Sequence, residues 1–79
     1  MKTVSIRVVG KKSFKSKKGN DLTIIYFLSS PFEDGVEGSE AGFFFANDDY
    51  SAEAEIDENY TAFLGYDRSG KYGVIGLIN

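Results

Sequence analysis

Short segments of alternating apolar and polar residues, separated by glycine-bearing turns, fill most of this chain. Val4, Ile6 and Val8 alternate with mostly polar residues, which is the period-two pattern of a half-buried strand. A turn at residues 17–21 contains a glycine, and the β-branched and aromatic residues of segment 21–30 predict a returning strand. This pattern predicts an all-β protein.

The middle of the chain predicts a loop, a short strand and one helical turn. Residues 29–42 hold the only proline, three glycines and four acidic residues, which is typical of a long polar loop. The three phenylalanines at 43–45 predict a short strand, which ends at the turn formers of residues 47–49. Ser51 is expected to cap a helical turn over residues 52–56, whose isoleucine packs it onto the protein.

A second hairpin is predicted at the end of the chain. Residues 60–66 and 72–78 indicate two strands, and the turn between them, at 67–71, contains a glycine. The core candidates of the returning strand are its aliphatic residues: Val74, Ile75, Leu77 and Ile78.

Two hairpins and a middle strand give about five strands in 79 residues. The closed arrangement that fits them is a small five-stranded Greek-key barrel of the OB type, with one short helical turn after the third strand. An SH3-like barrel is the main alternative, and an open antiparallel sheet fits less well because several strands are apolar on both faces. We expect one domain, residues 1–79. The chain has no cysteine to form a disulfide, so a homodimer is expected as a further source of buried area.

Charge is divided unevenly along the chain, although the formal net charge is only −3. Residues 1–20 carry seven of the nine basic residues and no acidic one, whereas residues 21–79 carry all twelve acidic residues. A basic arm of this kind is typical of a surface that contacts a polyanion.

Composition argues against several classes of function. The chain has no histidine or cysteine, and these supply the commonest general base, thiol nucleophile and transition-metal ligands. Its acidic residues do not follow the Ca²⁺-binding D-x-[DN]-x-[DN]-G spacing, and its glycines do not form a phosphate-binding G-x-x-x-x-G-K-[ST] loop. We therefore expect a protein that is not an enzyme and that uses no metal or cofactor.

Since the sequence shows neither a membrane-spanning run nor a signal peptide, we expect a cytoplasmic protein without membrane contact.

Basic and aromatic residues occur together in both predicted hairpins. Sequence-tolerant single-strand binders use this combination, because cations follow the phosphates and rings stack on bases. The expected phosphate contacts are Lys11, Lys12, Lys15, Lys17, Lys18, Arg68 and Lys71, and the expected stacking residues are Phe14, Tyr26, Tyr66 and Tyr72. Two other interpretations stay open: the lysines protect a sheet edge from aggregation, and Tyr72 belongs to the core.

Taken in order, these features resemble the single-stranded-DNA-binding proteins of filamentous phages, a family of small dimeric OB-fold proteins. The similar segments are the opening strand at 3–8, the turn at 16–20, the strand Asn-Tyr-Thr-Ala-Phe-Leu at 59–64 and the turn Gly-Lys-Tyr-Gly at 70–73. The resemblance implies that Tyr72 stacks on a base, that Lys17 or Lys18 replaces a DNA-binding arginine, and that a phage or mobile element is the setting. The chain departs from the family at Leu22, where the family has a tyrosine, and at residues 43–46, where the family's strand offers a lysine.

Single-stranded DNA is therefore the expected partner. A second hypothesis is a protein-interaction module whose acidic surface, from Glu33 to Glu58, docks onto a basic protein. A third is an assembly subunit that pairs through its edge strands. Basic side chains that converge with exposed rings favour DNA, whereas scattered lysines and buried rings favour an interaction module.

Overall fold

The computed structural model describes residues 2–46 and 48–79 and shows five antiparallel strands in a nearly closed barrel, as predicted for a small OB-like barrel. The elements are β1 (Thr3–Lys15), β2 (Asp21–Ser29), β3 (Glu40–Phe45), α1 (Asp49–Ala52), β4 (Asn59–Tyr66) and β5 (Tyr72–Leu77). The strand predicted at 43–45 begins earlier, at Glu40. Of the turn predicted at residues 47–49, Asn47 lies outside the described residues.

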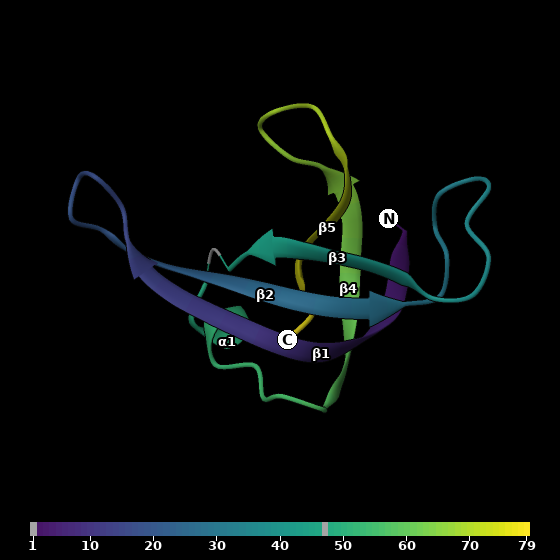
Figure 1. Ribbon diagram of the computed structural model, residues 1–79, viewed down its shortest axis with the longest axis horizontal. Coiled ribbons are helices and arrows are strands. Elements are labelled where there is room, and N and C mark those ends of the chain that lie inside the picture. Colours follow the sequence, from purple (N-terminus) through teal and green to yellow (C-terminus); the bar gives the residue numbers. More distant parts are fainter. Residues whose placement is uncertain (1, 47) are drawn as a thin grey trace.

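The strands follow the order β3-β2-β1-β4-β5, and each neighbouring pair is antiparallel. The long strand β1 is central, because residues 3–7 pair with β4 and residues 6–15 pair with β2. β3 lies against β5, which brings the two margins of the sheet together (Figure 1). The open antiparallel sheet considered as an alternative is therefore wrong.

A β-bulge in β1 decides which residues of its second half face outward. Ile6 and Val8 point into the core, so strict alternation would also send Lys12 and Phe14 inward. The register with β2 shifts between Val8 and Gly10, and the extra residue reverses the alternation. As a result, Lys12 and Phe14 lie on the outer face of the barrel.

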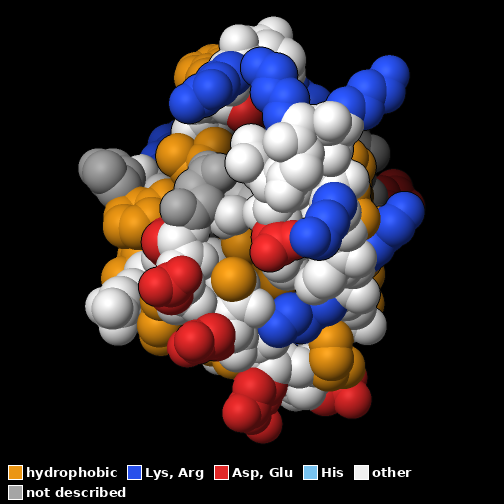
Figure 2. Space-filling model, turned by 90° about the vertical axis from the view of Figure 1, so that its left-hand side faces the viewer, with side chains coloured by type: hydrophobic (Ala, Val, Ile, Leu, Met, Phe, Trp, Pro, Cys, Tyr) orange, Lys and Arg blue, Asp and Glu red, His pale blue; other side chains and the backbone are white. Residues whose placement is uncertain are grey.

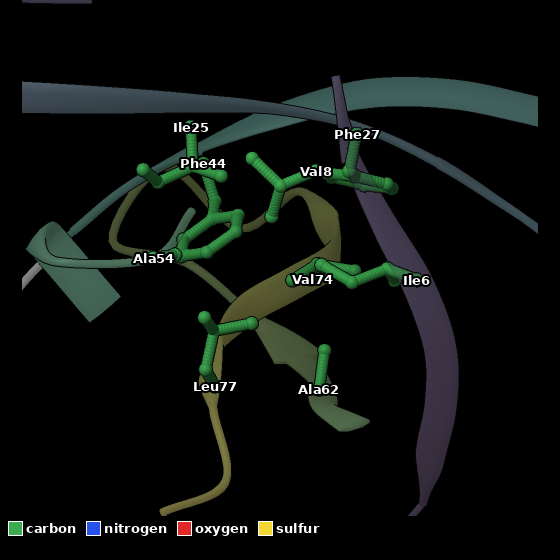
Figure 3. Close-up of a cluster of buried hydrophobic side chains, with 9 residues drawn as sticks. All are labelled: Ile6, Val8, Ile25, Phe27, Phe44, Ala54, Ala62, Val74 and Leu77. Carbon is green, nitrogen blue, oxygen red and sulfur yellow. The ribbon is translucent and has the colours of Figure 1, made fainter. Parts of the chain in front are cut away.

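The core lies between the β1–β2–β3 part of the sheet and the β4–β5 hairpin (Figure 3). Its buried side chains are Ile6, Val8, Ile25, Phe27, Phe44, Ala54, Ala62, Val74 and Leu77. The ring of Phe27 covers Gly42, where an added Cβ would lie only 3.0 Å from the ring. Two predicted core residues do not belong to this buried set, since Ile75 is exposed and Ile78 is half-buried.

The helix predicted over residues 52–56 begins earlier than expected. Asp48 caps α1, because its carboxylate accepts a hydrogen bond from the Ser51 N–H at 2.7 Å. Ser51 is fully buried and its hydroxyl accepts from the Leu77 N–H at 3.3 Å, so it joins α1 to β5 and is not the cap. Ala54 enters the core, whereas Ile56, the expected packing residue, is exposed.

Within residues 2–46 and 48–79, no helix has the length and apolar character needed to cross a membrane.

Candidate nucleic-acid interface

The tips of the β1–β2 and β4–β5 hairpins are built in the same way. The N–H of Gly19 donates to the carbonyl of Ser16 at 2.9 Å, and the N–H of Gly70 donates to the carbonyl of Asp67 at 3.0 Å. The two glycines have φ of 85° and 84°, in the left-handed region that other residues rarely adopt. This is the three-residue hairpin loop with a left-handed glycine. This loop leaves the two residues before each glycine exposed at the hairpin tip: Lys17, Lys18, Arg68 and Ser69.

A carboxylate orders the β4–β5 tip. Asp67 Oδ1 accepts hydrogen bonds from the Ser69 hydroxyl at 2.6 Å, the Ser69 N–H at 2.9 Å and the Lys71 N–H at 3.0 Å. These bonds favour the charged carboxylate, and the Ser69 hydroxyl contributes most to lowering the pKa of Asp67 below its ordinary value of 3.8. Since the carboxylate is held by its own turn, Arg68 projects from a tip of fixed shape.

The outer face of β2 and β3 exposes three aromatic rings side by side. Tyr26 pairs across the strands with Phe43, and their ring centroids are 6.2 Å apart. Phe43 and Phe45 follow each other on the same face of β3, with centroids 6.3 Å apart. The exposed fractions of Tyr26, Phe43 and Phe45 are 38%, 53% and 46%. We call these three residues the aromatic face.

β1 extends the aromatic face with a cation and a fourth ring. The Lys12 ammonium lies 5.8 Å from the centroid of the half-buried Phe14 ring, which is within cation–π range. Lys12 and Phe45 pair with the same β2 residue from opposite sides, so Lys12 lies in the same cross-strand row as Phe45. Gly10 pairs with Tyr26, and an added Cβ at Gly10 would lie 3.4 Å from the Tyr26 ring. This glycine therefore lets the ring lie across β1.

The structure places two of the predicted phosphate contacts away from this face. Lys11 pairs with the core residue Ile25, and its ammonium donates to the carbonyl of Ala52 at 2.6 Å, at the end of α1. Lys15 faces the same side as Lys11, and its ammonium is 4.0 Å from the Asp21 carboxylate. Neither side chain joins the row of Lys12 and the rings.

The two predicted tyrosines of the β4–β5 hairpin meet at the base of its tip. Tyr66 and Tyr72 are cross-strand partners, and their rings pack edge to face with centroids 5.1 Å apart. Tyr66 is 72% exposed, whereas Tyr72 is half-buried. The two cations of this hairpin, Arg68 and Lys71, are both exposed.

In Figure 1 the tip of the β1–β2 hairpin projects to the left and the tip of the β4–β5 hairpin projects to the top, and β3 lies below the β4–β5 tip. Figure 2 looks onto the end that carries the β1–β2 hairpin. Lys and Arg side chains lie over the upper part and the right of that face, and Asp and Glu side chains lie mainly along its lower left.

No family model, curated protein or solved structure matches this chain. The candidate interface is defined by geometry alone.

Phe43 and Phe45 are the most exposed phenylalanines of the chain, and they were missing from the predicted stacking residues. Alternation along the three successive phenylalanines places Phe43 and Phe45 on one face of the strand and Phe44 on the other, and the closure of the barrel determines which face is exposed. In the part of the chain that the structure describes, acidic side chains do not gather in a group of three that could hold a metal ion.

Proposed function

We propose that this protein binds single-stranded nucleic acid, DNA in the first place, without preference for base sequence. The observation that carries the proposal is the aromatic face, where three rings lie exposed on the same face of the sheet as Lys12. Base–aromatic stacking contributes about 1–3 kcal/mol per base, and every base offers a face to stack on. A row of exposed rings beside a cation supports this kind of contact.

The hairpin tips supply the charge for the same ligand. Lys17 and Lys18 stand on one tip, and Arg68 and Lys71 belong to the other. Their ammonium and guanidinium groups are free to follow a phosphate backbone, which carries no base information. Stacking and phosphate contact together give affinity that tolerates any sequence.

The test is the binding of fluorescein-labelled oligo-dT, followed by anisotropy at low salt. Phe43→Ser removes the most exposed ring of the aromatic face and is expected to weaken binding about 5- to 150-fold. The matched control is Ile56→Ser, which removes an exposed apolar side chain outside this face and should leave affinity unchanged. If the wild-type protein gives neither an anisotropy change nor a gel shift, the proposal fails.

A second candidate is docking onto a basic protein. It is favoured by the acidic side chains that gather apart from most of the cations in Figure 2. Replacement of Lys17 and Lys18 by glutamine separates the two functions. Nucleic-acid affinity should fall with this replacement, because two phosphate contacts are lost, whereas a complex formed through the acidic side should keep its affinity.

Two further parts of the proposal follow from the resemblance to the phage proteins. One is that the protein acts as a homodimer, which sedimentation equilibrium of the full chain would test. The other is that it works in the cytoplasm of a cell that carries a phage or mobile element.

A further inference from the structure

An open groove of about 510 Å³ lies between the start of β1, the β2–β3 loop and the β4–β5 hairpin. It is lined by Lys2, Phe32, Leu64, Gly65, Tyr66 and Tyr72. This volume is within the range of small-molecule sites. In Figure 1 these three parts are the N-terminal end of the chain, the hairpin at the top and the loop at the right.

The groove is ordered before any ligand arrives. On the loop side, one oxygen of the buried Glu40 carboxylate accepts the N–H of Phe32 at 2.9 Å and that of Glu33 at 3.1 Å. On the hairpin side, the edge-to-face packing of Tyr66 against Tyr72 fixes the opposite wall. Rigid walls of this kind reduce the entropy that a ligand loses on binding.

The chemistry of the lining selects the kind of occupant. Three aromatic rings line the groove, two of them with phenol hydroxyls. Lys2 adds a basic side chain to the lining, and its backbone carbonyl accepts a hydrogen bond from the Leu64 N–H at 3.0 Å. Among the described residues of the lining, none is acidic. A flat ring with a nearby anion matches this set, because the ring can stack on Tyr66 while the anion pairs with Lys2.

Resting on the proposed function, we infer that this groove holds one base of the bound strand, with Tyr66 as the stacking surface and Lys2 as the phosphate contact. The groove is the last site on the strand's path. Beyond Phe32, the β2–β3 loop exposes Glu33, Asp34 and Glu37, and these carboxylates repel a phosphate backbone that would continue past it.

The experiment measures affinity as a function of strand length, with (dT)₄ and (dT)₁₂ binding to the full-length protein followed by anisotropy. Tyr66→Ser is expected to weaken the binding of (dT)₁₂ about 5- to 150-fold and to leave (dT)₄ unchanged, because the short strand fills only the aromatic face. Tyr66→Phe keeps the ring and should bind both lengths like the wild type. Tyr66 is largely exposed, so both variants should fold, and circular dichroism checks that they do.

The outcomes separate this inference from the proposed function. If the wild type binds both strands and Tyr66→Ser binds them equally well, the groove is not a base site, although the aromatic face still is. Equal losses for the two lengths, or a loss in Tyr66→Phe as large as in Tyr66→Ser, overturn a terminal stacking site. If the wild type binds neither strand, both the inference and the proposed function fail.

Discussion

The salt dependence of binding gives the sharpest test of how the cations are arranged. Five of the nine basic residues lie on the aromatic face or in the hairpin tips: Lys12, Lys17, Lys18, Arg68 and Lys71. If each of these five neutralises one phosphate on a strand too short to reach the groove and Lys2, log K should fall with log[salt] with a slope of about −3.5. Between about 50 and 200 mM salt, this slope amounts to an affinity loss of about a hundredfold.

Replacing Lys17 and Lys18 by glutamine removes two of these contacts. The slope should change to about −2.1, and the same increase in salt should then weaken binding only about twentyfold. The matched control replaces Lys11 and Lys15 by glutamine, which removes the same net charge. Because Lys11 binds the end of α1 and Lys15 lies on the opposite side from Lys12, the control should keep a slope near that of the wild type.

The measurement is a series of oligo-dT titrations at four salt concentrations for the wild type and both double variants. Thermal unfolding of each variant shows whether it is folded at the assay temperature. Equal slopes for the two double variants would refute the arrangement, because they would mean that net charge alone, and not the position of each lysine, controls binding.

Three further predictions concern the fold itself. Gly42→Ala should lower the free energy of unfolding by about 1–3 kcal/mol in urea denaturation, because the new methyl group presses on the buried Phe27 ring. Gly76→Ala, where an added Cβ meets nothing within 4 Å, is its control, and equal losses would contradict the packing argument. Ser51→Ala should cost about 1–3 kcal/mol in the same assay, because a buried β5 N–H loses its acceptor, and an unchanged midpoint would show that the bond contributes nothing. The lowered pKa of Asp67 means that its contribution to stability is present above pH 3.8 and is lost as pH falls through the lower folded value. Asp67→Asn should remove this part of the acid transition. An ordinary pKa for the wild-type Asp67 carboxyl, measured by NMR titration, would contradict the prediction.

Much of the fold could be predicted because the strands carry their pattern locally. Ile6 and Val8 alternate with polar neighbours, and Gly19 and Gly70 mark the two tips where only a left-handed residue closes the turn. The start of α1 could not be read in this way. Asp48 and Ser51 are both good cap residues, and the burial of the serine hydroxyl against β5 decided between them.

The candidate site was harder to predict than the fold. No residue type predicts the bulge between Val8 and Gly10, yet this single extra residue determines that Lys12, and not Lys11, lies on the outer face of the barrel. The exposure of Phe45 depends on which side of β3 meets the core, which is a property of the closed barrel and not of the segment.

The position of β3 at the edge of the sheet has a consequence for how the protein would accommodate the proposed single strand. β2 pairs with β1 on one side and with β3 on the other over residues 24–29, while β3 belongs to a single ladder, the one with β2. Amide hydrogens of β3 should therefore exchange with solvent sooner than those of β2. In the proposed complex, a strand that opens locally in this way would let Phe43 and Phe45 shift to stack on purines and pyrimidines of different width, while the rest of the barrel keeps its shape.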